Sequence, residues 1–433
     1  MNKDVYARRR AELVSQISER DIVIVSTSQV KSRNGDVDYQ FRADSDFYYL
    51  SGFMEPESVL VISPGRAQGE YILFCREKDI KHEMWHGRRF GLEGAMAQFG
   101  ADDAFPIEDI NDILPGLMEE KEKVYTTVGR YPDFDAQLLG WMTKIKEENR
   151  LGKNAPYEFV DLNHLLHEQR LIKSKDEIAL MRKAAKMTSA GHARAMQVCK
   201  PGMYEYQVQA EMECEFRKAG SHYNAYPSIV AGGDNACILH YTENQDVLTD
   251  GDLLLIDAGA EFSCYASDIS RTFPVNGKFS PEQKALYEIV LSAQESAFEK
   301  CAAGLGWNEP HDAAVTVIAQ GLLDEGLLRG SLEQVLETRS YLQFYMHRTG
   351  HWLGMDVHDV GDYQLEGQWR ELEPGMVFTV EPGIYVSPAN DVDDRWHNIG
   401  IRIEDNVLIR KVGYENLTAA APKTIADIET LMA

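Results

Sequence analysis

Two aspartates in the second half of the chain, the first of them at the end of an apolar strand, could bring their carboxylates to one point. Asp257 closes the apolar run that starts at Leu253, and Asp268 follows eleven residues later. The segment 259–264 between them can turn the chain, which would place the two carboxylates on adjacent strands. A buried carboxylate is costly unless it is paired with a cation or a metal. The alternative to a metal site is an ion pair between Asp268 and Arg271.

Two glutamates have the same relation to apolar strands. In the segment Val377-Phe-Thr-Val-Glu381-Pro-Gly, alternate residues share one face of a strand, and Glu381 emerges beside a Pro-Gly turn. In Ile399-Gly-Ile-Arg402-Ile-Glu404-Asp, the isoleucines line one face of the predicted strand, and Arg402 and Glu404 line the other. Glu404 is therefore a second candidate ligand, and its neutralisation by Arg402 is the alternative.

Three histidines fall within twelve residues, in His347-Arg-Thr-Gly-His351-Trp-Leu-Gly-Met-Asp-Val-His358. The i, i+4 pair is similar to the helix of zinc proteases, but the glutamate between the histidines is missing. Gly350 and Gly354 would also weaken a helix. We therefore predict a loop that presents several imidazoles, of which any single one is more often structural than a metal ligand.

The charges of these candidates favour two metal ions over one. Four carboxylates and one neutral imidazole around a single dication would leave about two negative charges uncompensated, whereas two dications bring the set near neutrality and can hold a bridging hydroxide. An oxygen-rich set with one nitrogen and no sulfur favours Mn²⁺, Co²⁺ or Fe²⁺ over a thiolate zinc site. We expect two divalent ions, Mn²⁺ first, with Co²⁺, Fe²⁺ or Zn²⁺ as alternatives.

The composition of the whole chain limits its class. Its 433 residues exceed the usual size of one hydrophobic core, so two domains are expected. A balance of 44 Lys+Arg against 69 Asp+Glu, a formal net charge of −25, disfavours nucleic acid and anionic membranes as partners. The six cysteines form no C-x-x-C pair, and the N-terminus lacks the apolar run of a secretory signal. A cytoplasmic protein with free thiols is the expectation.

The first 173 residues are predicted to form the smaller, α/β domain. Short strands are expected over 22–26, 58–62, 71–74 and 124–128, and helices over 8–19 and 109–121. Ser174-Lys-Asp-Glu177 has the pattern of a capping box, which would open a long helix that runs to about Cys199. The domain boundary is therefore drawn between residues 173 and 174.

Residues 174–433 are predicted to form a larger α+β domain, with helices packed on a mostly antiparallel sheet. Helices are expected near 281–303 and 311–325, and strands over 253–257, 377–381 and 399–405. Neither a Walker-type phosphate loop nor the glycine series of a dinucleotide-binding fold occurs in the chain.

The order Asp, Asp, His, Glu, Glu in these segments resembles the pita-bread metallopeptidases, a family that includes methionine aminopeptidase, prolidase and aminopeptidase P. The aminopeptidase P group looks most similar, through segments 237–244, 267–279, 351–361 and 400–405, and through 44–53 and 85–91 in the first domain. Two positions depart from the pattern. Arg348-Thr-Gly precedes His351, and Cys264 occupies a turn where a small glycine is commoner.

This resemblance implies a role for each candidate ligand. Asp257 and Asp268 would hold one metal together with Glu404. Asp268 and Glu404 would bridge to the second metal, which His351 and Glu381 would complete. Glu381 would also act as the proton shuttle between the metal-activated water and the leaving nitrogen.

The resemblance also implies which residues contact the substrate. His240 and His358 would stabilise the tetrahedral intermediate, and His347 and Arg402 would lie near the pocket for proline, with Arg402 also steadying the metal ligands and Tyr385 at its border. In the first domain, Asp36, Asp38 and Trp85 are candidates for narrowing the cleft, often with help from a neighbouring subunit. Each of these last three could instead be a simple surface or interface residue.

The activity that the resemblance implies is hydrolysis of the bond between an N-terminal residue and a following proline, by a homodimer or homotetramer acting on peptides. An Xaa-Pro dipeptidase of the same fold is the nearest alternative, since an arginine such as Arg402 could bind the free carboxylate after proline. A non-catalytic peptide-binding relative and a metal-free creatinase-type hydrolase are further alternatives. The presence of all five candidate ligands argues against both.

Overall fold

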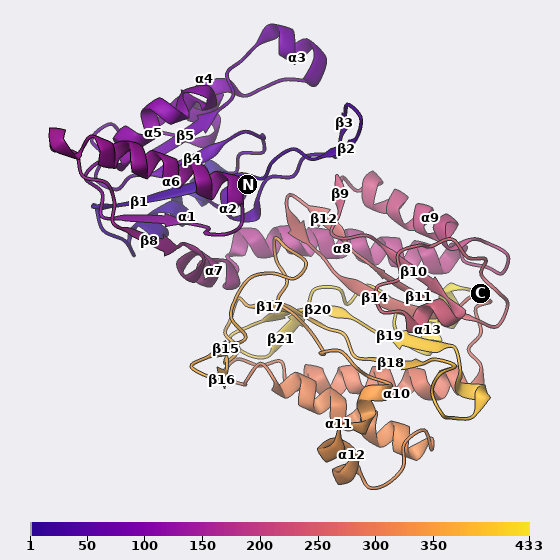
Figure 1. Cartoon of the computed structure of the whole chain (residues 1–433). Helices are drawn as coiled ribbons and strands as arrows, with labels where there is room; N and C mark the ends of the chain where they lie inside the picture. The colour runs from indigo at the N-terminus through magenta and orange to yellow at the C-terminus, as the bar shows by residue number, and fades with distance from the viewer. Residues whose placement is uncertain (1) are drawn as a thin grey trace. The chain divides into compact units, whose positions relative to one another are not determined.

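The computed structural model describes residues 2–433 and divides into two compact units, Met1–Gln169 and Arg170–Ala433 (Figure 1). This division falls a few residues before residue 173, where the sequence analysis draws the boundary between functional domains. No helix within residues 2–433 is long and apolar enough to cross a bilayer.

The first unit is built on a six-stranded mixed sheet in the order β6-β5-β4-β1-β7-β8. Its strands are β1 (Asp21–Ser26), β4 (Val59–Ile62), β5 (Tyr71–Cys75), β6 (Asp103–Pro106), β7 (Lys123–Thr126) and β8 (Glu158–Asp161). The central strand β1 pairs antiparallel with β4 and parallel with β7. The four strands predicted from the sequence are all present in this sheet.

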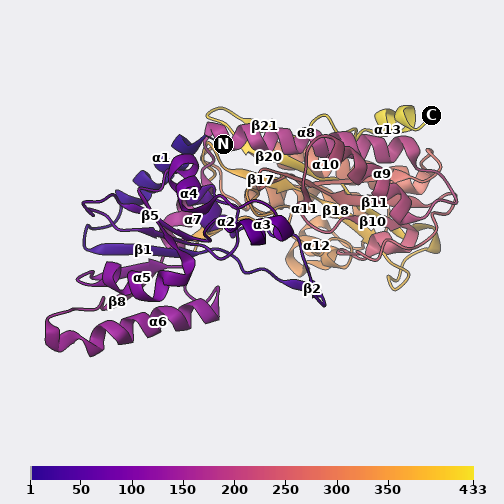
Figure 2. The same ribbon diagram turned by 90° about the horizontal axis from the view of Figure 1, so that it is seen from above.

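Helices cover both faces of this sheet, as Figure 2 shows for α5 and α6 on one face and α1 on the other. The helices are α1 (Lys3–Val14), α2 (Ser45–Ser51), α3 (Ile80–His86), α4 (Gly91–Phe99), α5 (Ile110–Met118), α6 (Pro132–Glu147) and α7 (Asn163–Leu171). Apolar side chains of β1 and β4 pack against Leu114 of α5 and against Leu138 and Trp141 of α6. The predicted first helix, 8–19, was placed too late in the chain. The helix stops at Val14 because a turn follows, in which the Ser18 amide donates to the Asp21 carboxylate at 2.8 Å.

The second unit begins with the predicted capping box. The Ser174 amide donates to Glu177 at 2.9 Å, the Glu177 amide donates to the Ser174 hydroxyl at 3.4 Å, and α8 runs from Lys175 to Val198. The other helices are α9 (Glu205–Lys218), α10 (Pro281–Phe298), α11 (Glu309–Asp324), α12 (Leu332–Thr338) and α13 (Ile425–Leu431). Figure 1 shows α8 and α9 along one flank of the strands and α10 and α11 along the opposite flank.

The strands of this unit form several short sheets, and all of their described pairings are antiparallel, as predicted. The strands around the candidate site are β10 (Ile229–Gly232), β11 (Leu253–Ala258), β14 (Ile269–Pro274), β17 (Val377–Val380), β18 (Gly383–Val386), β19 (Ile399–Arg402) and β20 (Asp405–Ile409). β11 lies between β10 and β14, β17 pairs with β20, and β18 pairs with β19. The hairpin β12–β13 (Ala260–Phe262 and Tyr265–Ala266) joins β11 to β14, and Cys264 in its turn has a φ of 65°, a conformation that favours glycine.

The predicted strand over 399–405 is wrong in one respect, because the chain breaks there into β19 and β20. A matching break separates β17 from β18 on the paired strands, at Glu381 and Pro382. Proline has no amide hydrogen and cannot continue a ladder as a donor. Both segments therefore change their pairing at the same point, from β17–β20 to β18–β19. The two breaks leave Glu381 and Glu404 outside the regular strands.

Candidate active site

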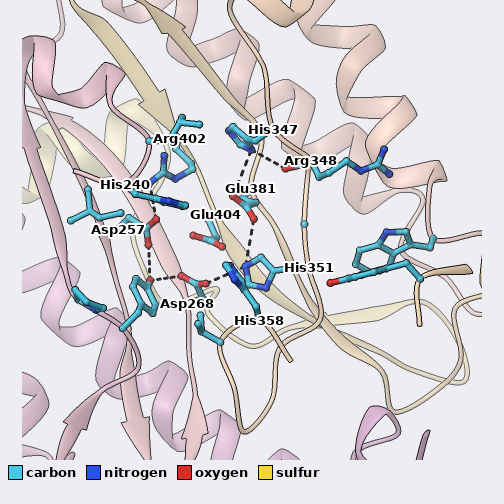
Figure 3. Close-up of a pocket in the computed structure, with 18 of the residues that line it drawn as sticks. His240, Asp257, Asp268, His347, Arg348, His351, His358, Glu381, Arg402 and Glu404 are labelled. Carbon is cyan, nitrogen blue, oxygen red and sulfur yellow. Dashed lines mark hydrogen bonds and ion pairs between the residues drawn. The ribbon is translucent and has the colours of Figure 1, made fainter. Parts of the chain in front are cut away.

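A pocket of ≈ 1110 Å³ in the second unit collects the predicted site residues (Figure 3). Its lining includes the five candidate ligands Asp257, Asp268, His351, Glu381 and Glu404, together with His240, His347, His358 and Arg402. The remaining wall is partly aromatic, with Trp307, Tyr363 and Trp369. A concave site with convergent polar groups and aromatic walls is the usual form of a small-ligand or peptide site.

The two aspartates meet as the sequence predicted. Asp257 lies on β11 opposite Ser270 of β14, and Asp268 directly precedes β14. The Tyr226 hydroxyl reaches both side chains, at 2.6 Å from Oδ1 of Asp257 and within hydrogen-bonding range of Oδ1 of Asp268. The ion pair between Asp268 and Arg271, considered as the alternative, is not formed; Arg271 is fully buried and pairs with Asp405 at 2.7 Å.

The second alternative, an ion pair between Arg402 and Glu404, is also not formed. Nη2 of Arg402 donates to Oδ2 of Asp257 at 2.7 Å, whereas Oε2 of Glu404 accepts from the Ser270 hydroxyl at 2.8 Å. One ligand atom from each of Asp268, His351 and Glu404 lies within 4.8 Å of the other two, and this arrangement could hold a metal ion. These donors belong to three segments far apart in the sequence.

The ring orientation of His351 leaves one nitrogen for the cluster. Nδ1 donates to its neighbour's carbonyl, that of Trp352, at 3.0 Å. Nε2 therefore faces the carboxylates, at 3.4 Å from Oδ2 of Asp268 and 3.6 Å from Oε1 of Glu381. A backbone acceptor on the far nitrogen is the usual way to fix a metal-binding imidazole.

The electrostatics of the cluster indicate a shortage of positive charge. Burial, reinforced by the neighbouring carboxylates, raises the pKa of Glu404 well above its ordinary range, and burial raises the pKa of Glu381 to about 7 against the charges of His351 and Arg402. Burial opposes protonation of His351, yet its hydrogen bond to Asp268 and the charge of Glu381 raise the pKa of His351 to about 9. The carboxylates therefore draw a proton onto the imidazole, and the oxygen-rich donor set fits divalent cations that would supply this missing charge.

Several residues that support the ligands were not found from the sequence. Asn406 holds the backbone of Asp268, accepting from its amide at 3.1 Å and donating to its carbonyl. Thr379 accepts from the His351 amide at 3.1 Å and donates to Oε1 of Glu381 at 3.3 Å. A signal for Thr379 existed, since it lies two residues before Glu381 on one strand; Tyr226 had none, because only the folded chain brings it to the aspartates.

Arg402 and Tyr385 link the cluster to His347. Nε of Arg402 donates to Ser270 at 2.8 Å and Nη1 donates to the Tyr385 hydroxyl at 2.9 Å. This hydroxyl in turn donates to Nε2 of His347 at 2.9 Å, and Nδ1 of His347 donates to a backbone carbonyl. Burial and the charge of Arg402 lower the pKa of His347 to about 3, so His347 is neutral. Tyr385 itself is buried behind the pocket wall.

His240 and His358 approach the cluster from two loops. His240 follows a 3₁₀ turn, η3 (Gly233–Cys237), and His358 lies in the non-helical segment predicted after His351. The ring centroid of His358 is 4.3 Å from that of His351, and burial followed by the charge of His351 lowers the pKa of His358. Figure 3 shows His240 on the side of Asp257 and Arg402, and His358 beside His351.

The three candidates in the first unit do not line this pocket. Asp36 and Asp38 lie in the exposed hairpin β2–β3 (Ser32–Asn34 and Val37–Asp38), and Trp85 lies on α3 with 85% of its surface exposed. Their role in narrowing the cleft stays a prediction.

Comparison with known proteins shows which family the chain resembles. Residues 179–411 match Metallopeptidase family M24, and residues 6–125 match the aminopeptidase P N-terminal domain. The Xaa-Pro aminopeptidase of Haemophilus influenzae is 44% identical over 430 residues, covering 99% of this chain and 97% of that protein. The Xaa-Pro aminopeptidase of Escherichia coli is 41% identical over 433 residues, covering 100% and 98%.

The fold is shared with solved structures over its whole length. The structure of Pseudomonas aeruginosa aminopeptidase PepP superposes with a TM-score of 0.99 at 55% identity, covering 100% of this chain and 98% of that one. This chain belongs to Metallopeptidase family M24 and is an enzyme of that family. Within the family it has the two-domain form of aminopeptidase P, with a pita-bread catalytic domain after a smaller α/β domain, which confirms the resemblance drawn from the sequence.

Proposed function

We propose that this enzyme removes the N-terminal residue from peptides whose second residue is proline, with two divalent cations, most readily Mn²⁺, bound in the carboxylate cluster. The observation that carries the proposal is the cluster of Asp268, His351 and Glu404, with Asp257 and Glu381 beside it, in a pocket large enough for a peptide end. The names of the H. influenzae and E. coli relatives supply the proline preference.

We assign the five ligands as the resemblance implies: Asp257 and Asp268 would hold one ion, His351 and Glu381 would hold the other, and Asp268 and Glu404 would be shared by both. A pair of divalent ions would supply a nucleophile by lowering the pKa of bound water. Glu381 would serve as the proton carrier of the reaction, taking a proton from the attacking water and giving it to the leaving nitrogen.

The substrate-side roles follow from the imidazoles. His240 and His358 line the same pocket as the cluster, where a donor would stabilise the charge that develops on the scissile carbonyl oxygen. We assign the proline ring to the side of His347, which Tyr385 keeps in one orientation through its hydroxyl. The scissile amide before proline is tertiary and has no N–H to donate. An enzyme that cleaves this bond must therefore bind the substrate without a hydrogen bond from that amide.

The Xaa-Pro dipeptidase alternative relied on Arg402 to bind the free carboxylate after proline, and the surroundings of Arg402 disfavour this role. Arg402 is 4% exposed, and Ser270, Tyr385 and Asp257 already accept from its Nε, Nη1 and Nη2. It is therefore poorly placed to receive a peptide carboxylate. The non-catalytic alternative is disfavoured because all five candidate ligands are brought to one pocket.

We further propose a homodimer or homotetramer in which Asp36, Asp38 and Trp85 help to narrow the cleft of a neighbouring copy. The exposed apolar face of α3, with Ile80, Met84 and Trp85 at 80%, 82% and 85% exposure, supports an interface there. The functional domains are assigned to 1–173 and 174–433. The six free cysteines support a reducing, cytoplasmic location.

The test is a comparison of three peptides. The protein is stripped with chelator, supplied with Mn²⁺, and given Ala-Pro-Ala, Ala-Pro and Ala-Ala-Ala in parallel. Metal-dependent release of alanine from Ala-Pro-Ala alone is the expected result. Preference for Ala-Pro would assign the enzyme to the dipeptidases, and no cleavage of any peptide by the metal-loaded protein would overturn the proposal.

A further inference from the structure

A buried carboxylate, Glu205, lies at the first turn of α9 and accepts hydrogen bonds only from neutral donors among its described contacts. Its side chain is fully buried, with 0% exposure. Oε1 accepts from the Gly232 amide at 2.8 Å and Nδ2 of Asn235 at 3.1 Å. Oε2 accepts from the Tyr241 hydroxyl at 2.8 Å and the Asp246 amide at 3.0 Å. Four hydrogen bonds and the helix N-terminus offset the cost of burying this charge.

All four donors belong to segment 232–246, which carries His240. Asn235 precedes the turn that holds His240, and Tyr241 directly follows it. Within this turn the Ile238 amide donates to the Asn235 carbonyl at 2.9 Å, and the Tyr241 amide donates to the Ile238 carbonyl at 3.3 Å. Glu205 therefore contacts the chain on both sides of His240.

The same segment joins the pocket to the core. The Tyr241 ring is buried in a small cluster with Ile229, Leu255 and Tyr385, whereas Leu239 and His240 line the pocket. α9 also packs on β10, whose partner strand β11 carries Asp257. Four hydrogen bonds to Glu205 anchor this segment, and the imidazole of His240 is exposed on it. The segment is therefore suited to hold the His240 imidazole in one position.

We propose that Glu205 is a positioning residue that fixes His240 over the metal cluster. This inference rests on the proposed function, in which His240 stabilises the reacting carbonyl oxygen. Glu205 acts only through the segment 232–246 and touches neither ligands nor substrate. The two oxygens have separate tasks: Oε1 holds the η3 end of the segment and Oε2 holds its Tyr241 end.

The first test is the Glu205→Gln variant. An amide nitrogen can replace only one oxygen, and wherever it sits it faces two donors that then lose their acceptor. A shift of about 1 Å in a catalytic group costs up to about 100-fold in rate, so we expect kcat on Ala-Pro-Ala to fall about tenfold or more. The KM and the bound Mn²⁺ should stay near their wild-type values, because the five ligands lie on other segments.

The matched control is Glu177→Gln. Glu177 is also a buried glutamate in the first turn of a helix, and it accepts from the Tyr265 hydroxyl and the Ser174 amide outside the pocket. This variant should lose comparable stability and keep its kcat. A milder pair repeats the comparison: Tyr241→Phe removes one donor to Glu205, and Tyr287→Phe removes a buried hydroxyl that donates to the Lys423 carbonyl. Only Tyr241→Phe should lower kcat.

A double-mutant cycle separates positioning from general destabilisation. If Glu205 acts through His240, then Glu205→Gln should lower kcat in the wild-type background and have no further effect in a His240→Ala background. Equal fold-losses in the two backgrounds would overturn the proposal. So would an unchanged kcat in both Glu205→Gln and Tyr241→Phe.

Hydrogen exchange supplies a readout that does not depend on turnover. Glu205→Gln should speed amide exchange in peptides covering 233–246 and leave the segment 347–361 unchanged, whereas Glu177→Gln should leave both unchanged. Unchanged exchange in 233–246 would overturn the positioning role. If exchange rises there while the wild-type protein cleaves none of the three peptides, the proposed function fails and the anchoring of the His240 segment stands.

Discussion

Replacing Glu381 with glutamine should stabilise the metal-free protein and weaken the binding of one of the two proposed metal ions. The glutamine keeps the shape of the side chain and can still accept from Thr379, which donates to Oε1 at 3.3 Å. It removes one negative charge from a cluster in which burial has already raised the pKa of Glu381 to about 7, from an ordinary value of 4.5. The loss of this charge should therefore reduce the repulsion between the buried carboxylates and increase the folding stability of the metal-free protein.

The magnitude follows from this gap in pKa. Because the folded-state pKa is raised, the contribution of this carboxyl to stability is fully present below pH 4.5 and is lost as the pH rises through 7. At about 1.4 kcal/mol for each tenfold change in proton affinity, the ionised carboxylate costs the metal-free protein up to about 3 kcal/mol above pH 7. His351 loses one of its two carboxylate neighbours in the variant, which makes this figure an upper value.

The assay is urea unfolding of chelator-treated protein at pH 5 and pH 8.5, followed by circular dichroism. Glu381→Gln should be more stable than wild type by about 2 kcal/mol or more at pH 8.5 and by less than about 1 kcal/mol at pH 5. Added Mn²⁺ should stabilise the variant less than the wild type, because the variant keeps the ligands of one ion and loses a ligand of the other. A variant that gains nothing at pH 8.5, or that gains equally at both pH values, would refute this prediction.

Three further predictions concern the cluster and its surroundings. Burial lowers the pKa of His192 to about 4, so the stability that its neutral form contributes is present above pH 6.5 and is lost as the pH falls toward 4. In urea unfolding, the wild type should lose up to about 3 kcal/mol across this pH range. The His192→Gln variant should not show this loss, because its amide does not titrate and can still donate to the Ala258 carbonyl. Arg402→Lys has one nitrogen in place of three and cannot reach Ser270, Tyr385 and Asp257 at once, so we expect the metal-free protein to lose about 2–4 kcal/mol of stability in calorimetry. Equal stability of the variant and the wild type would count against a structural role for these three hydrogen bonds. Asp257→Ala, His351→Ala and Glu404→Ala should each abolish release of alanine from Ala-Pro-Ala and keep the far-ultraviolet circular dichroism of the wild type; turnover retained by any of them would require a new assignment of the site.

Local sequence signals were sufficient for much of the fold. The Ser174–Glu177 capping box fixed the start of α8, because both of its hydrogen bonds lie within four residues of chain. Apolar runs that end in an acidic residue located Asp257 and Glu381 correctly at the ends of β11 and β17. The glycines around His351 correctly excluded a helix there. In each case a few neighbouring residues determine the structure.

The ion-pair partners of Arg271 and Arg402 could not be predicted from neighbouring residues in the sequence. Arg271 is three residues from Asp268 but pairs with Asp405, 134 residues away, and Arg402 pairs with Asp257 across 145 residues. The nearest opposite charge in sequence was therefore the wrong partner in both cases. The packing of β11 and β14 against β19 and β20 brings the actual partners together.

The break between β19 and β20 was missed for a related reason. Ile399 to Asp405 reads as one alternating strand, and nothing in these residues interrupts it. The interruption comes from the paired segment, in which Pro382 separates β17 from β18. A pattern read along one strand gives no information about its partner, and the partner here determines where Glu404 leaves the sheet.

Equilibrium dialysis against Mn²⁺ tests most directly whether the five residues hold two divalent ions. We predict two ions per chain for the wild type and for Glu177→Gln, and fewer than two for Glu404→Ala, which lacks the proposed bridging carboxylate. Two ions bound by Glu404→Ala, or fewer than two by the wild type, would show that these residues do not hold the ions as proposed.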